Sequence, residues 1–330
     1  MALNVLLEIQ NLHISFGPVK AVNGVDLTLH EGEFLALVGE SGCGKSVTAL
    51  SVTRLLPVPP AKIEGGKILF GGVDLLTLPD AALRKVRGGQ VAYIFQEPAT
   101  SLNPVLTIGD QIGEVLKLHR GMSRDAAKKE STALLSRVGL RDPGERLRTY
   151  PHELSGGMKQ RVMIAMALAS SPRLLIADEP TTALDVTVQS EILSLLLQLK
   201  KEMGIALLFI THDLSLVSQV SDTVAVMYCG RIVERGRTAE VLKSPFHPYT
   251  IGLIRCVPRG GVRKSAFPVI SGTLPDPADL PTGCHFHPRC PFKESLCEKE
   301  YPPRETKSPD HEVCCFKAEE AHRSFGGVLE

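Results

Sequence analysis

The stretch "FLALVGESGCGKSVTAL", residues 34–50, decides the fold. It joins an apolar run to a helix-forming run through several glycines, and it matches the pattern G-x-x-x-x-G-K-[ST]. Glycines let the backbone curl until successive N–H groups face one centre, and the helix that follows adds the partial positive charge of its N-terminus. The alternative, a glycine-rich turn with a surface lysine, is disfavoured because the motif lies between a strand-like and a helix-like run. The stretch therefore predicts a phosphate-binding loop.

The motif also assigns roles to its residues. Lys45 is expected to reach the β- and γ-phosphates of a nucleotide, and the Ser46 hydroxyl to ligate Mg²⁺. The other residues expected to contact the nucleotide are Gly39, Ser41, Gly42, Gly44 and Val47.

A second site is predicted where "RLLIADEPTTALD", residues 173–185, places two acids after an apolar run. Leu174–Ala177 is typical of a strand buried on both faces of a parallel sheet. Asp178 and Glu179 then lie at the carboxyl edge of the sheet, where α/β proteins bind ligands. One carboxylate can hold Mg²⁺ and the other can take a proton from an attacking water. Most Asp-Glu pairs are caps or surface residues, so the interpretation depends on the upstream phosphate loop.

Two further stretches belong with these sites. A third strand-like run, "IALLFITHD", ends near His212, which could touch the γ-phosphate from the same edge. In "LSGGMKQRVMIAMALA", residues 154–169, Ser155 and two glycines precede a helix. Amides, the serine hydroxyl and the helix dipole can all point at an anion there. One nucleotide needs one phosphate loop, so a second anion-seeking turn requires a separate explanation.

The stretch at 154–169 resembles the signature sequence of ABC-type ATPases, and the other markers of that family follow in order. They are Gln96 in "YIFQEP", Ala183–Asp185 as "ALD", and His212. The resemblance covers about residues 3–250. It implies that two cassettes face each other head to tail, with each ATP between the phosphate loop of one chain and the signature turn of the other.

The resemblance implies roles for further residues. Phe16 would stack on adenine, although many members have tyrosine there and a core phenylalanine is the alternative. Gln96 and Asp178 would complete the Mg²⁺ site begun by Ser46, and Glu179 would be the base. The residues implied to contact the ATP of the partner chain are Ser155, Gly156 and Gly157. Asp185 would connect the two halves.

The expected fold is α/β: an ABC-type ATPase with a RecA-like parallel sheet core, an antiparallel β edge and a helical subdomain. We expect the ATPase domain over residues 1–250, with the helical subdomain at about 97–160, where apolar positions recur at helical spacing. Residues 251–330 are expected to form an irregular extension that carries cysteines. Within it, residues 258–282 are rich in Pro and Gly and are expected to connect without regular structure.

Composition limits the other possibilities. The formal net charge is +1, from 37 basic and 36 acidic residues, which argues against a nucleic-acid partner. The start of the sequence has no secretory signal pattern, and no apolar run approaches the length of a membrane span. We therefore expect a soluble, cytosolic protein in which thiols stay reduced.

Three short stretches narrow the resemblance: "TSLNP" at 100–104, "HPYT" at 247–250 and "GCHFHPRCP" at 283–291. Together they resemble the ATPase subunits of oligopeptide, dipeptide and nickel importers. This resemblance implies a peripheral protein at the cytoplasmic face of the bacterial inner membrane. Its partners would be two transmembrane permeases, a second and related ATPase subunit (a heterodimer rather than a homodimer) and an extracytoplasmic binding protein. Peptide import is the leading function, and import of nickel or another small solute is the alternative. Two more remote alternatives are a non-transport ABC ATPase acting on ribosomes or DNA and a nucleotide-binding scaffold without hydrolysis.

The last 47 residues of the chain gather five of its eight cysteines. Disulfides are disfavoured by the compartment, and zinc would require closer pairs, although His285 and His287 could help to supply its ligands. Four thiolates also suit a [4Fe–4S] cluster. Some importer ATPases of the resembling group carry one at matching positions, so the resemblance implies an iron–sulfur cluster. Its ligands would be Cys284, Cys290, Cys297 and Cys315, the last rather than Cys314; Zn²⁺ remains the alternative.

Overall fold

The computed structural model describes residues 4–182, 184–257 and 269–326. The chain divides into two compact units. The first contains His30–Glu33 and Thr77–Ile210, and the second contains Val5–Leu29, Phe34–Leu76 and the chain from Thr211 onward. Each unit is described by itself.

The first unit combines three parallel strands with helices. The strands are β6 (Val91–Ile94), β7 (Leu174–Asp178) and β8 (Ala206–Thr211), and β7 pairs with both of the others. Every residue of β7 and β8 is buried, which explains why both sequences are continuous apolar runs with no alternation. The carboxyl end of β7 carries the two acids that the sequence singles out, and His212 of the second unit follows β8 along the chain.

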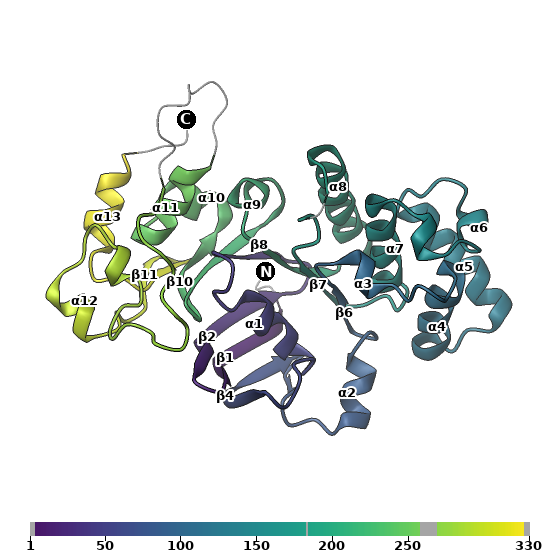
Figure 1. Cartoon of the computed structure of the whole chain (residues 1–330), viewed down its shortest axis with the longest axis horizontal. Coiled ribbons are helices and arrows are strands. Elements are labelled where there is room, and N and C mark those ends of the chain that lie inside the picture. Colours follow the sequence, from purple (N-terminus) through teal and green to yellow (C-terminus); the bar gives the residue numbers. More distant parts are fainter. Residues whose placement is uncertain (1–3, 183, 258–268, 327–330) are drawn as a thin grey trace. The chain divides into compact units, whose positions relative to one another are not determined.

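Helices of the first unit pack beside one another in Figure 1, where α4, α5 and α7 lie together. Ser123 caps α5 by accepting a hydrogen bond from the N–H of Ala126, and Gly121 ends α4 in the left-handed conformation. The helices of this unit are α2 (Asp80–Val86), α3 (Pro98–Ser101), α4 (Ile108–Arg120), α5 (Arg124–Arg137), α6 (Pro143–Arg146), the 3₁₀ turn η1 (Pro151–Glu153), α7 (Gly156–Leu168) and α8 (Val186–Met203).

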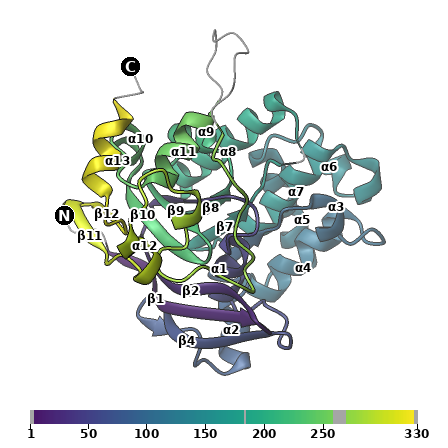
Figure 2. The ribbon, with the colours of Figure 1, turned by 60° about the vertical axis from the view of Figure 1, so that its left-hand side comes forward.

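The second unit contains an antiparallel sheet of four strands in the order β2-β1-β4-β5, of which β2, β1 and β4 are seen side by side in Figure 2. A second group of strands begins with β3, which pairs in parallel with β9; β9 then pairs with β10, β10 with β12 and β12 with β11, all antiparallel. The strands are β1 (Val5–Phe16), β2 (Val19–His30), β3 (Phe34–Val38), β4 (Ala61–Phe70), β5 (Val73–Asp74), β9 (Thr223–Tyr228), β10 (Arg231–Arg237), β11 (Glu305–Ser308) and β12 (His311–Val313).

The C-terminal part of the chain is built into the core of the second unit. Phe286 and Phe325 are buried in the same cluster as Tyr228 and Tyr249, and β12 extends the strand group through β10. The helices of this unit are α1 (Lys45–Val52), α9 (Leu214–Val220), α10 (Thr238–Lys243), α11 (Pro248–Cys256), the 3₁₀ turn η2 (His287–Arg289), α12 (Ser295–Lys299) and α13 (Ala318–Phe325). Of the segment 258–282, expected to be irregular, residues 258–268 lie outside the described residues. The remainder, 269–282, has no helix or strand.

Parallel strands, an antiparallel sheet and a helical group are therefore all present, as the sequence predicts. Over the described parts of the chain, no helix combines the length and the apolar character needed to cross a bilayer.

Candidate functional site: a nucleotide-binding loop, an acidic strand end and a capped turn

The phosphate loop connects buried strand β3 to helix α1 in the second unit. A Cβ atom added to Gly39 would collide with the carbonyl oxygen of Met227, and one added to Gly44 would collide with that of Ala21. Gly44 also has φ of 105°, a conformation that L side chains rarely adopt. These two glycines of the motif are thus required by the surrounding backbone as well as by the ligand that the motif predicts.

Lys45 is the buried cation of this loop, with a side chain that is only 4% exposed. Its Nζ donates hydrogen bonds to the carbonyl oxygens of Gly39, at 2.8 Å, and Glu40, at 3.0 Å. Both acceptors are neutral carbonyl groups, so these two hydrogen bonds hold the ammonium inside the loop without neutralising its charge. A nucleotide phosphate could therefore replace the loop carbonyls as the hydrogen-bond acceptor of this ammonium group.

The other residues of this unit that are predicted to contact the nucleotide lie in the loop, in helix α1, at the end of β1 and after β8. Ser41 and Gly42 are exposed, while Ser46 and Val47 are half-buried in the first turn of α1. Phe16 is the last residue of β1, half-buried and paired with Ala61 of β4. The exposed His212 lies in the bend between β8 and α9, just before Asp213, the N-cap of α9.

The acidic end of β7 is the corresponding feature of the first unit. Asp178 is 5% exposed, and its Oδ2 accepts a hydrogen bond from the hydroxyl of Tyr93 at 2.7 Å. Burial, together with the charge of Asp178, raises the pKa of Tyr93 well above its usual value. Tyr93 therefore stays a neutral donor that orients the carboxylate of Asp178.

Glu179 follows Asp178 in a left-handed backbone conformation, with φ of 45°. This turn separates the two adjacent carboxylates. Its Oε2 accepts hydrogen bonds from Nε2 of Gln96, at 3.1 Å, and from Oγ1 of Thr182, at 2.9 Å. The side-chain amide of Gln96 thus donates through its NH₂ group to Glu179. The carbonyl oxygen of the same amide is the atom that could ligate a metal. The structure brings Gln96 into contact with Glu179, the residue next to Asp178.

The signature turn caps helix α7. Ser155 is the N-cap, and its Oγ accepts a hydrogen bond from the N–H of Met158 at 3.4 Å. Gly157 approaches Val188 so closely that a Cβ would lie 2.8 Å from its side chain. Asp185 in turn caps α8 by accepting from the N–H of Val188 at 3.0 Å. The signature turn and the start of α8 therefore form one packed corner; Ala183 of the "ALD" marker lies outside the described residues.

Three residues that contact these sites were not predicted from the sequence. Tyr93 and Thr182 bind the two carboxylates, and Tyr249 binds the phosphate loop because its hydroxyl accepts a hydrogen bond from the N–H of Glu40 at 2.9 Å. Tyr249 belongs to the "HPYT" stretch, which marks the importer resemblance but gives no indication of this contact.

The structure contradicts the predicted iron–sulfur cluster. Among the described residues, which include all four proposed ligands, no group of three or more His, Cys, Asp or Glu side chains could hold a metal ion. Cys284, Cys290, Cys297 and Cys315 are not joined by disulfides. The prediction of a [4Fe–4S] cluster is therefore wrong, and the described residues provide no zinc site in its place.

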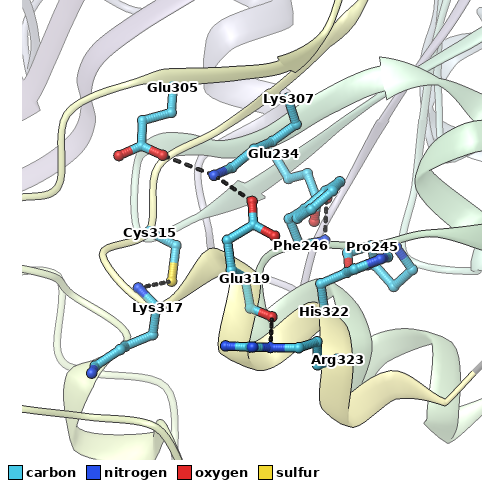
Figure 3. A network of polar contacts seen from close by, with 10 residues as sticks. All are labelled: Glu234, Pro245, Phe246, Glu305, Lys307, Cys315, Lys317, Glu319, His322 and Arg323. Atoms are coloured by element: carbon cyan, nitrogen blue, oxygen red, sulfur yellow. Dashed lines mark hydrogen bonds and ion pairs between the residues drawn. The ribbon is translucent and has the colours of Figure 1, made fainter.

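The physical reason lies in how the thiols are packed. The four cysteines line one hollow of about 10 Å³ together with Phe286, roughly the room that a single water needs. Burial raises the pKa of Cys284 to about 11 and that of Cys315 to about 12, which favours neutral thiols. In Figure 3 the sulfur of Cys315 accepts a hydrogen bond from the N–H of Lys317, at 3.3 Å.

Known proteins are similar to this chain over most of its length. The ABC transporter family profile matches residues 22–182, and that of the oligopeptide/dipeptide transporter C-terminal region matches residues 233–297. The chain is 50% identical to the dipeptide transport ATP-binding protein DppD of Bacillus subtilis, over 94% of each chain. It is 48% identical to the oligopeptide transport ATP-binding protein OppD of Salmonella typhimurium, over 95% of this chain and 94% of that protein.

Solved structures resemble the chain as well. One is the dimeric post-hydrolysis state of the ATP-binding cassette MJ0796 bound to ADP and Pi, with a TM-score of 0.63 and 28% identity over 71% of this chain and 99% of that one. Another is cbiO1 from Clostridium perfringens, part of the ABC transporter complex cbiONQ, with a TM-score of 0.63 and 29% identity over 72% of this chain and 90% of that one.

Proposed function

The chain belongs to the ABC transporter family and is an ATPase, and from this premise we propose that it powers the import of di- or oligopeptides. One observation carries the proposal. The oligopeptide/dipeptide transporter C-terminal region lies on the same chain as an intact phosphate loop, acidic strand end and signature turn. Relatives that share nearly the whole length include a dipeptide and an oligopeptide transport ATP-binding protein.

The phosphate loop is proposed to bind ATP. Lys45 stabilises the β- and γ-phosphates, and the amides of the loop surround the phosphate chain. The buried position of Lys45 against neutral carbonyls supports this role, because these acceptors hold the ammonium group without neutralising its charge. Phe16 is proposed to stack on the adenine. The other contacts are assigned to Gly39, Ser41, Gly42, Gly44, Ser46 and Val47.

Hydrolysis is proposed to use the acidic strand end. Ser46, Gln96 and Asp178 offer hydroxyl, amide and carboxylate oxygens, the donor set that Mg²⁺ prefers. The ion, when bound, would neutralise charge on the phosphates. Glu179 polarises the attacking water and accepts its proton while the bond between the γ-phosphorus and the bridging oxygen breaks, giving ADP and phosphate. His212 contacts the γ-phosphate. Because Glu179 is hydrogen-bonded to Gln96 and Thr182, its carboxylate is held in place before ATP arrives.

Each ATP is proposed to lie between two chains. Ser155, Gly156 and Gly157 bind the γ-phosphate of the ATP on the partner ATPase, and Asp185 connects the halves. The N-terminus of α7 supports this role because its amides and dipole favour an anion. The ATP-binding cassette MJ0796, which resembles this chain, is described as a dimer bound to ADP and Pi.

The assembly is proposed to contain two transmembrane permeases, an extracytoplasmic binding protein and a second, related ATPase. The chain would lie peripherally at the cytoplasmic face of the bacterial inner membrane. We assign residues 1–250 to the ATPase domain, with a helical subdomain at about 97–160, and residues 251–330 to the extension. The near-neutral net charge gives no support for a nucleic-acid partner.

The test is reconstitution of the complex purified in detergent with this chain as bait. We expect permeases and a related ATPase to co-purify, and peptide-loaded binding protein to stimulate ATP hydrolysis in liposomes. Glu179→Gln in the same complex should abolish uptake while the complex still assembles. Stimulation by nickel-loaded binding protein alone would replace the peptide by a metal substrate, and recovery of ribosomes without permeases would overturn the transport function.

A further inference from the structure

The side chain of Arg289 joins the cysteine-containing part of the extension to the phosphate loop. Arg289 ends the 3₁₀ turn η2 within "GCHFHPRCP", and its Nη1 donates a hydrogen bond to Oε2 of Glu40 at 2.9 Å. The two residues are 249 positions apart in sequence. The Arg289 side chain is 5% exposed and that of Glu40 is 28% exposed, so the pair is largely shielded from water.

The guanidinium of Arg289 is held on several sides. Its Nε donates to the carbonyl oxygen of Ser271 at 3.1 Å, and its Nη2 donates to that of Ile270 at 3.4 Å. Nη1 also approaches the hydroxyl of Tyr228 at 3.4 Å. A planar guanidinium with several fixed donors is pre-organised, and it therefore fixes the position of whatever carboxylate it binds.

Glu40, on the other side of the pair, is held through three different groups. Arg289 binds its carboxylate, and the hydroxyl of Tyr249 accepts a hydrogen bond from its N–H at 2.9 Å. Its carbonyl oxygen accepts from Nζ of Lys45 at 3.0 Å. The placement of Glu40 thus sets one of the two carbonyls that hold Lys45.

The chemistry of the pair indicates a specific role in the loop. Glu40 lies beside the predicted site of a polyanionic nucleotide, where an unpaired carboxylate would repel the phosphates. Arg289 neutralises this carboxylate and turns it toward the extension. Without Arg289, the loop would carry a negative charge close to its ligand, and Glu40 would lose the contact that keeps its backbone in place.

We propose that Arg289 is a positioning residue for the phosphate loop, so that the extension takes part in nucleotide binding by its own chain. The proposal rests on the proposed role of the Lys45 loop as the ATP site. It assigns the "GCHFHPRCP" stretch a task that needs no metal: the short turn ending at Arg289 presents the guanidinium to Glu40.

A second ion pair between the extension and the core offers a matched control. Nη2 of Arg304 binds Oδ2 of Asp26 at 2.8 Å, nearly the same distance as in the Arg289–Glu40 pair. Asp26 belongs to β2, not to the phosphate loop, and both side chains are about two-fifths exposed, at 41% and 42%. If ion pairs serve only to dock the extension, both pairs should behave alike.

The experiment compares ATP hydrolysis by the full-length chain with that of Arg289→Gln, Glu40→Gln and Arg304→Gln. We expect Arg289→Gln to raise the KM for ATP at least about 5-fold, the lower end of typical coupling between sites. Its kcat should change little, because the contact acts equally on the ground state and the transition state. Arg304→Gln should leave KM unchanged, and Arg289→Lys, which keeps the charge, should recover part of the loss.

The double variant Glu40→Gln/Arg289→Gln tests whether the two residues act as one unit. Its KM should be no higher than that of Arg289→Gln, because the single change already removes the interaction. If Arg289→Gln fails to fold, Glu40→Gln provides the comparison from the loop side, and a KM equal to wild type there overturns the proposal. It is equally overturned if Arg289→Gln matches wild type, or if Arg304→Gln raises KM as much. If the loop is not the ATP site at all, the result is different: the wild-type chain would bind no ATP, or Lys45→Ala would bind ATP normally.

Discussion

Single side chains at the end of β7 divide the chemistry between two adjacent carboxylates. Asp178 is buried and oriented by Tyr93, whereas Glu179 turns away in a left-handed conformation and is held by Gln96 and Thr182. Neighbouring carboxylates would otherwise repel each other. The separate hydrogen-bond partners allow one to serve as a metal ligand and the other as a base.

Replacing Glu179 by Gln is expected to leave ATP binding intact and to slow hydrolysis by about 10²–10⁴-fold, the usual contribution of a general base. The amide keeps the shape of the side chain but cannot accept the proton from water. Equilibrium binding of a fluorescent ATP analogue and phosphate release, measured on the same preparation, test both parts. Hydrolysis near the wild-type rate would remove Glu179 from this role.

Tyr93→Phe is expected to lower the free energy of unfolding by about 1–3 kcal/mol, because the buried carboxylate of Asp178 loses the hydrogen bond from Tyr93. Urea denaturation measures this loss. An unchanged midpoint and slope would mean that water or another group replaces the hydroxyl without cost.

At the scale of one element, helix α11 shows how the "HPYT" stretch is used. His247 is the N-cap, and its Nδ1 accepts a hydrogen bond from the N–H of Tyr249 at 3.1 Å. This imidazole is 1% exposed, and burial lowers its pKa from 6.5 to about 3. The cap therefore helps to place Tyr249, which binds the phosphate loop. This arrangement requires the imidazole of His247 to remain neutral.

This burial predicts a pH dependence of stability. The unfolded chain binds a proton at His247 below pH 6.5, and the folded chain does not until about pH 3. The contribution of His247 to stability is thus fully present above pH 6.5 and is lost as the pH falls below it, by about 1.4 kcal/mol per pH unit.

His247→Asn keeps a side-chain oxygen that can cap the helix but cannot titrate. Urea unfolding between pH 7.5 and 5.0 should therefore show a slope against pH that is smaller by about one proton than in wild type. Equal slopes for the two proteins would show that His247 is not a buried neutral imidazole.

At the scale of the whole molecule, the chain carries a phosphate loop and a signature turn that are proposed to serve two different ATP molecules. When two copies of this chain stand in for the pair with the related ATPase, a closed pair with two-fold symmetry contains two identical sites, each made from both chains. This arrangement makes hydrolysis a property of the pair.

Mixing two inactive variants tests the arrangement. Lys45→Ala and Ser155→Arg should each nearly abolish hydrolysis. An equal mixture should recover at most about a quarter of the wild-type rate, because half of the pairs contain one intact site. Phosphate release after mixing is the measurement. If mixed pairs form by sizing chromatography but no activity returns, ATP is not bound between the chains.

The family and the α/β fold could be predicted from sequence because local rules decide them. Only glycine fits where a Cβ would strike the backbone, as at Gly39 and Gly44, and strands buried on both faces need continuous apolar runs. The tertiary structure alone decided which distant side chains meet. Tyr93 reaches Asp178 and Arg289 reaches Glu40 through packing that no local spacing encodes. The cysteines show the same limit. The family resemblance implied a metal cluster, whereas packing placed the four cysteines, one buried and three half-buried, around a hollow with no room for a cluster.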